Sequence, residues 1–146
     1  MPFETILVAS DFGDAARSAL DWAVDLARGL GASVLVAHVY DLPLVGFPDA
    51  TLMVNAETAA RLGNEAQAAL NAEVARVQVR GVPIRGLLRQ GDPRDGVPSL
   101  AASEGADLIV VGSHGRRGVA RALLGSVAED ILRRSSIPVA VVRQGT

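Results

Sequence analysis

Five short runs of apolar residues, separated by longer stretches with helical periodicity, restrict the fold of this 146-residue chain more than any other feature. They lie at 6–9, 34–39, 84–90, 108–111 and 139–142. Four of the runs are almost entirely apolar, which is typical of parallel strands covered on both faces. The third is weaker, because Arg85 and Arg89 alternate with apolar residues as in an edge strand half exposed to water.

Four helical patterns lie between these runs. They cover 14–30, 55–80, a stretch that starts near 92, and 126–135. Asp14 is the expected N-cap of the first helix, and Gly31 is expected to end it. In the third helix Pro93 suits the first helical position, but Gly96 and Pro98 predict a helix that is kinked or starts late.

The alternation of strands and helices predicts a single-domain α/β fold. Right-handed crossovers turn this order into a doubly wound five-stranded parallel sheet with helices on both faces. No linker, repeat or low-complexity tract divides the chain, so we expect one domain over 1–146. The segment 41–54 is expected to be a long loop rich in apolar residues. Two interpretations of it remain open: packing against a helix or a second subunit, or a lid over the binding site.

The composition excludes several classes of site and partner. The absence of cysteine removes disulfides, thiolate nucleophiles and thiolate metal sites. All 14 basic residues are arginine, so there is no P-loop lysine, kinase lysine or Schiff base. A net charge of −2 gives no electrostatic reason to expect nucleic acid or membrane as a partner. Since neither a signal peptide nor a membrane-length apolar run is visible, we expect a cytoplasmic protein.

The residues that follow the strands are the candidates for a binding site, because ligands bind beyond the carboxyl ends of parallel strands. Gly112-Ser113-His114-Gly115 follows the fourth strand, and Gly125-Ser126 opens the last helix. Glycines let backbone amides approach an anion, and a helix start adds unpaired N–H groups and the positive end of the dipole. The pattern indicates a phosphate site, although a glycine-rich loop that only turns the chain explains the same residues at this stage.

Charge is distributed unevenly along the chain. Residues 1–110 carry 8 arginines and 14 acidic residues, whereas residues 111–146 carry 6 arginines and 2 acidic residues. The positive excess therefore falls in the segment that contains the glycine loop, with Arg116, Arg117 and Arg121 within it. This favours a polyanionic ligand such as the phosphate tail of a nucleotide, the alternative being a solvated arginine surface.

The spacing G-x2-G-x9-G-S over 112–126 matches the pattern of the ATP-binding branch of the universal stress protein family. The chain resembles that family over nearly its whole length. Segments that carry the resemblance lie at 6–11, 37–39, 91–93, 106–112 and 137–139. The resemblance implies a Rossmann-like sheet with strand order 3-2-1-4-5 and a homodimer joined through the last strand, Val139 to Val142. It also implies an ATP-binding, nucleotide-sensing regulatory protein of the stress response.

The resemblance further implies how a nucleotide is held. The expected ligand is ATP, or ADP or AMP, with Mg²⁺ or Mn²⁺ on the phosphates. Asp11 would be a polar contact near the ribose, base or metal, and Val39 would pack on the adenine. The implied nucleotide-binding residues are Ala9, Asp11, Val39, Val111, Gly112, Ser113, Gly115, Arg116, Gly125, Ser126 and Val127.

Two other functions remain open at this point. One is a slow ATPase or an autophosphorylating enzyme acting at Ser126 or a neighbour, for which the sequence names no general base. The other is a dimerising domain that binds no nucleotide, against which the intact glycine pattern argues. His38 and His114 are too few for a histidine-rich metal site. His38 is expected to be packed in the core or near the site, and His114 to lie in the glycine loop, where it would be able to donate to a phosphate.

Overall fold

The computed structural model describes residues 3–42, 44–47, 50–53, 55–114 and 124–143. Its main sheet is parallel, with the order β5-β2-β1-β6-β7. The strands are β1 (Thr5–Ala9), β2 (Ser33–Tyr40), β5 (Ile84–Gln90), β6 (Leu108–Gly112) and β7 (Val139–Val142). Counted along the main sheet alone, this is the predicted order 3-2-1-4-5, so the doubly wound fold is confirmed.

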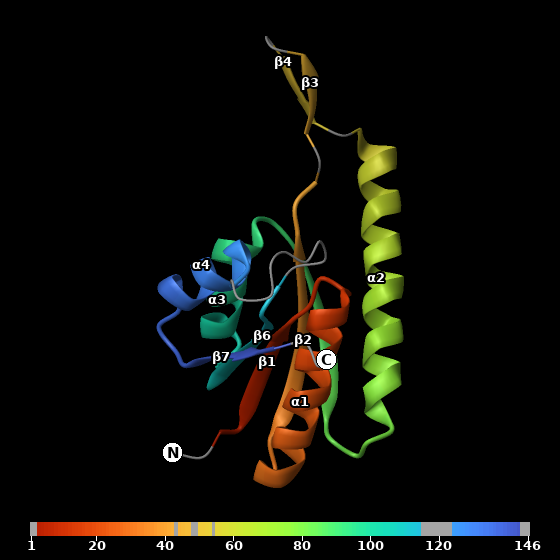
Figure 1. Cartoon of the computed structure of the whole chain (residues 1–146). Coiled ribbons are helices and arrows are strands. Elements are labelled where there is room, and N and C mark those ends of the chain that lie inside the picture. Colours follow the sequence, from red (N-terminus) through yellow and green to blue (C-terminus); the bar gives the residue numbers. More distant parts are fainter. Residues whose placement is uncertain (1–2, 43, 48–49, 54, 115–123, 144–146) are drawn as a thin grey trace.

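Helices cover both faces of the sheet (Figure 1). The helices are α1 (Asp14–Leu30), α2 (Ala56–Gln78), α3 (Pro93–Ser103) and α4 (Ser126–Arg134). Side chains of β1 point alternately to the two faces, so Ile6 and Val8 pack with α1 and α2 while Leu7 packs with α3 and α4. None of the helices within the described ranges is long and apolar enough to cross a membrane.

The two ends of α1 are set by different devices. Gly13, not Asp14, is the N-cap, so the expectation for Asp14 is wrong. The reason is that Asp11 Oδ1 already accepts the Gly13 N–H at 2.9 Å, which leaves Asp14 as the first helical residue. At the other end Gly31 adopts φ +68° and its N–H bonds to the carbonyl of Ala27, as expected of a glycine that ends a helix.

Helix α3 begins at its proline. The Asp92 side chain caps it by accepting the Arg94 N–H at 2.9 Å, and Pro93 occupies the first turn. The helix then continues through Pro98 to Ser103, so a late start is wrong. Pro98 lies inside the helix and has no N–H, so one backbone hydrogen bond of the helix is missing at this position.

Part of the segment expected to be a loop is a β-hairpin. Strands β3 (Leu44–Phe47) and β4 (Ala50–Met53) pair antiparallel and form a ribbon separate from the main sheet. The ribbon extends beyond the carboxyl end of β2, near the start of α2 (Figure 1). The expectation of a loop is therefore wrong over these eight residues, whereas both interpretations of the segment's role stay predictions.

Candidate functional site

A cleft opens at the carboxyl edge of the sheet around β1, where the strand order reverses: β2 and β5 lie on one side of β1, and β6 and β7 lie on the other. This is the switch point at which doubly wound sheets bind ligands. Most of the side chains around it are apolar and come from the ends of β1, β2 and β6 and from α1, α3 and α4. The cleft is lined by Ala9, Ser10, Asp11, Ala16, Ala37, Val39, Pro93, Val97, Val111, Gly112, His114, Val127, Ala128 and Ile131.

Six of the sequence-predicted site residues line this cleft. They are Ala9, Asp11, Val39, Val111, Gly112 and Val127. Ser113, Gly125 and Ser126 lie beside it, because the Gly125 N–H donates to the Ser113 carbonyl at 2.6 Å and Ser126 begins α4. Gly115 and Arg116 lie outside the described residues.

The cleft also has a wall that the sequence did not indicate. Val97 of α3 and Ile131 and Ala128 of α4 are buried among the lining residues, and the half-buried Pro93 lies with them. Strand ends indicate only the residues that follow the strands, whereas these residues belong to helices that cover the same face of the sheet. The apolar spacing of each helix indicates a buried face but not which of its residues reach the cleft.

Gly112 allows the end of β6 to approach α1 closely. A Cβ at this position would lie 2.7 Å from the carbonyl carbon of Ala15 and 2.8 Å from its oxygen. These are backbone atoms, so a side chain at 112 requires the helix to move. Gly112 is therefore needed for the packing of α1 against the cleft as well as for access to the backbone.

The loop after β6 is tied to both of its neighbours. Ser113 is buried, and its N–H donates to the Val142 carbonyl of β7 at 2.9 Å. Its carbonyl accepts the Gly125 N–H, and its hydroxyl lies 3.0 Å from Nδ1 of His114. Gly125 caps α4 without a side-chain hydrogen bond, so no side chain of the cap occupies the first-turn N–H groups of the helix. These groups lie beside Ser113, because Gly125 is bonded to it.

The turn between β1 and α1 brings a carboxylate to the cleft. The Ser10 N–H donates to the Ala37 carbonyl at 2.8 Å, and the Ser10 hydroxyl accepts the Phe12 N–H at 3.1 Å. Asp11 lies between these bonded residues and lines the cleft. Within the described ranges no group of three or more His, Cys, Asp or Glu residues is arranged to hold a metal ion.

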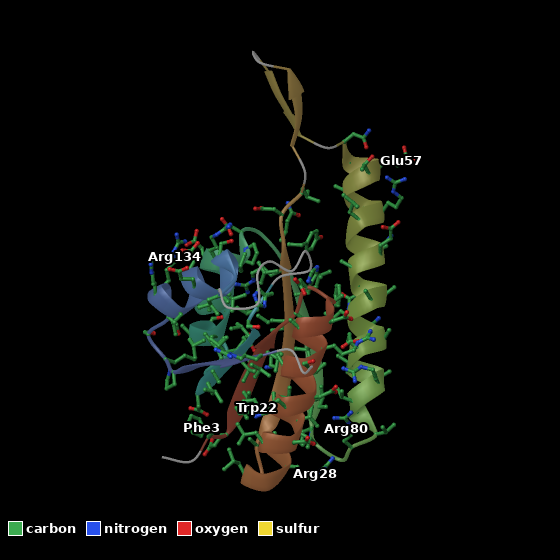
Figure 2. The ribbon with its side chains drawn as sticks, viewed as in Figure 1. Phe3, Trp22, Arg28, Glu57, Arg80 and Arg134 are labelled. Carbon is green, nitrogen blue, oxygen red and sulfur yellow. The ribbon has the colours of Figure 1, made fainter. Side chains whose placement is uncertain are left out.

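Ion pairs join the two helices that form the outer wall. Arg94 of α3 donates to Asp130 of α4 at 2.7 Å, and Arg134, labelled in Figure 2, pairs with Asp95. Within α4 itself, Arg133 pairs with Glu129 at 2.6 Å. Two of the arginines behind the predicted positive excess are thus matched by carboxylates, while Arg116, Arg117 and Arg121 lie outside the described residues.

Comparison with known proteins agrees with this architecture. The model of the universal stress protein family matches residues 2–143. A universal stress protein of Thermus aquaticus is 35% identical over 146 residues, a match that covers 97% of this chain and 99% of that protein. A universal stress protein solved in complex with cAMP has a TM-score of 0.72 at 27% identity, covering 99% of this chain and 100% of that one.

A further solved structure gives the same picture. The universal stress protein from Archaeoglobus fulgidus in complex with dAMP has a TM-score of 0.68 at 28% identity, and the match covers 97% of this chain and 98% of that one. The family match extends over nearly the whole sequence, and the sheet order is the one that the resemblance implied. The chain therefore belongs to the universal stress protein family.

Proposed function

We propose that the cleft binds an adenine nucleotide, with ATP as the ligand in the cell, and that the protein is a small nucleotide-sensing regulator of the stress response. In this proposal the whole chain, 1–146, is one nucleotide-binding domain. The observation that carries it is the position of the cleft. An apolar pocket lies at the switch point of the sheet, directly beside the glycine loop and the start of α4.

The lining divides into parts that suit the parts of a nucleotide. Val39, Val97 and Ile131 offer the apolar surface that a planar base needs, and Asp11 offers an acceptor for a polar group. Ser126 begins α4 beside Ser113, so the first-turn N–H groups of this helix face the region into which phosphates would extend. The complexes of two family members with cAMP and dAMP support the adenine base.

A divalent ion would enter with the phosphates. Asp11 is the one carboxylate among the described lining residues, and a single carboxylate does not make a resident metal site. Mg²⁺ and Mn²⁺ commonly take most of their oxygen ligands from phosphate and water, with one or two protein carboxylates. We therefore place Mg²⁺ or Mn²⁺ on the phosphate chain, with Asp11 as its protein ligand or as a ribose contact.

Strand β7 is the proposed homodimer contact. It lies at the edge of the sheet, and its four residues, Val139 to Val142, are apolar and only half-buried. An apolar edge strand of this kind is prone to pair with another chain. A second copy that adds its own β7 would cover both edges at once.

Isothermal titration calorimetry of nucleotide-free protein with ATP, ADP, AMP and cAMP, each with and without Mg²⁺, tests the proposal. We expect saturable binding of adenine nucleotides and a stronger interaction with ATP in the presence of Mg²⁺. An absence of heat with every one of them would overturn the nucleotide function. Release of phosphate over hours, measured in parallel, would favour the slow ATPase instead.

Two tryptophan variants on α4 locate the site. Val127→Trp fills the cleft and is expected to abolish binding, because Val127 is a half-buried lining residue. Leu132→Trp is the matched control, since Leu132 lies on the same helix, is 46% exposed and does not line the cleft. If both variants bind ATP as well as the unchanged protein does, the ligand does not occupy this cleft.

A further inference from the structure

We propose that His38 is a positioning residue for nucleotide binding: it holds the turn between β1 and α1 so that Asp11 stays at the cleft. This proposal rests on the proposed function. His38 itself does not line the cleft, so its effect would pass through the turn. The residues concerned are Ser10, Asp11 and Phe12 in the turn and His38 and Tyr40 on β2.

The first link is a short hydrogen bond from β2 to the turn. Nδ1 of His38 lies 2.6 Å from the carbonyl oxygen of Ser10. A carbonyl oxygen only accepts, so Nδ1 must carry the hydrogen, which fixes the neutral ring in its Nδ1–H tautomer. The N–H of the same Ser10 donates to the Ala37 carbonyl. Two consecutive residues of β2 therefore hold both backbone groups of Ser10, which is only 7% exposed.

The second link is a row of three rings in contact. The Phe12 and His38 rings have centroids 4.3 Å apart at an interplanar angle of 37°, and the His38 and Tyr40 rings are stacked with centroids 5.7 Å apart. Phe12 has φ +66°, and among the described residues it is the only one other than glycine with positive φ. This backbone conformation is unfavourable for a residue with a Cβ, so neighbouring contacts must stabilise it. The His38 ring supplies such a contact.

The consequence falls on Asp11, which lies between the two residues that His38 touches. The Asp11 carboxylate lines the cleft while its Oδ1 accepts the Gly13 N–H at 2.9 Å. Its direction therefore depends on the conformation of Ser10 and Phe12. Without the bond to Ser10, the turn would populate other conformations, and a ligand would have to select the competent one.

The alternative is that His38 only packs in the strand, in which case its replacement changes stability and leaves affinity for nucleotide intact. Two substitutions separate the roles. His38→Phe keeps a ring in the row but removes the donor to Ser10. His38→Asn places an amide donor near the position of Nδ1 but removes the ring. We expect His38→Phe to weaken ATP binding about tenfold and His38→Asn to keep most of the affinity.

A double-mutant cycle tests whether the effect passes through Asp11. We expect Asp11→Asn and His38→Phe each to weaken ATP binding, and the combined variant to lose no more than about the larger single effect. Losses that multiply would overturn the positioning role. His38→Leu serves if His38→Phe does not fold, because leucine also lacks the donor to the Ser10 carbonyl. Weaker ATP binding by this variant is expected, and unchanged binding would overturn the proposal.

Amide hydrogen exchange without nucleotide provides a readout independent of binding. The Gly13 N–H, which is bonded to Asp11, is expected to exchange at least about fivefold faster in His38→Phe than in the unchanged protein. If exchange of the Gly13 N–H is unchanged in His38→Phe and the variant binds ATP normally, the positioning role of His38 is overturned while the proposed function stands. A failure of the unchanged protein to bind any adenine nucleotide overturns the proposed function instead, so the two failures are distinct.

Discussion

Gly96 of α3 lies so close to Val39 of β2 that a Cβ at position 96 would come within 2.7 Å of Val39 Cγ1. Val39 lines the cleft, so this contact links the packing of a helix to the shape of the site. Glycine inside a helix costs about 1 kcal/mol relative to alanine. The close approach of α3 to the cleft is therefore obtained at the expense of helix propensity.

Gly96→Ala is expected to weaken ATP binding about fivefold while changing stability modestly. The propensity gain of about 1 kcal/mol opposes an overpacking cost of about 1–3 kcal/mol, so the free energy of unfolding falls by at most about 2 kcal/mol. Val39 must give way, which alters the cleft. Calorimetry and urea unfolding followed by the fluorescence of Trp22 measure the two effects.

Gly29→Ala is the matched control for that variant. Gly29 is exposed in α1, its φ is not positive, and a Cβ there meets no atom within 4 Å. The substitution should raise the free energy of unfolding by about 0.5–1 kcal/mol and leave nucleotide affinity unchanged. A gain of stability without loss of affinity in Gly96→Ala as well would show that the Val39 contact is unimportant.

Gly112→Ala is expected to be more damaging than Gly96→Ala. Its Cβ would meet the backbone of Ala15, which cannot rotate away as a side chain does. We expect a loss of about 2–3 kcal/mol in the free energy of unfolding, together with weaker nucleotide binding. Urea unfolding checks the first effect. A stability equal to that of the unchanged protein would mean that α1 adjusts at little cost.

Glu73→Gln is expected to lower the free energy of unfolding by about 1–3 kcal/mol. Glu73 of α2 is 5% exposed and accepts from Arg17 of α1 and from Arg76, which also bonds to Asp21. Burial acts to lower the pKa of Arg76, but its hydrogen bonds to Glu73 and Asp21 raise it above the ordinary value. The variant leaves these guanidinium groups without their shared carboxylate, and urea unfolding measures the cost.

Glu129→Gln is the control for the Glu73 variant. It removes a carboxylate that pairs with Arg133 at 2.6 Å on the exposed surface of α4, where both side chains are well exposed. Exposed pairs of this kind contribute less than about 0.5 kcal/mol. Equal losses for the two variants would contradict a special role for the buried carboxylate.

Asp107 is expected to account for part of the stability that the fold loses in acid. The backbone N–H groups of Glu4 and Thr5 donate to its carboxylate and lower its pKa from the ordinary value. A lowered pKa in the folded state stabilises the fold above the unfolded pKa, and this stability is lost as pH falls through the folded pKa. As the pH falls through the acidic range in which carboxyl groups titrate, Asp107→Asn should therefore lose less stability than the unchanged protein. Parallel slopes in urea unfolding over that range would contradict the assignment.

Most of the fold is predictable from the sequence because its signals are local. Four nearly continuous apolar runs predict buried parallel strands, and Ile6, Leu7 and Val8 are indeed fully buried. The β3–β4 hairpin escaped prediction because Gly46 and Pro48 interrupt its apolar run. Proline and aspartate are residue types that favour turns, so the Pro48-Asp49 dipeptide in the sequence is compatible with a hairpin.

The site is predictable only where it follows strand ends. The cleft residues of β1, β2 and β6 come directly after apolar runs, so topology alone places them together. Val97 and Ile131 depend on how α3 and α4 cover the sheet, which no spacing within either helix reveals. The contact of His38 with the turn depends on the backbone conformation of Phe12, which the residue type does not predict.

Ser113 links the edge of the sheet to the start of α4 through its backbone. Its backbone groups form hydrogen bonds with two different elements. The Ser113 N–H donates to the last residue of β7, and the Ser113 carbonyl accepts from the residue that caps α4. The start of α4 and the last residue of β7 are therefore joined through the two backbone groups of a single residue, so the edge strand and the cleft share one point of attachment.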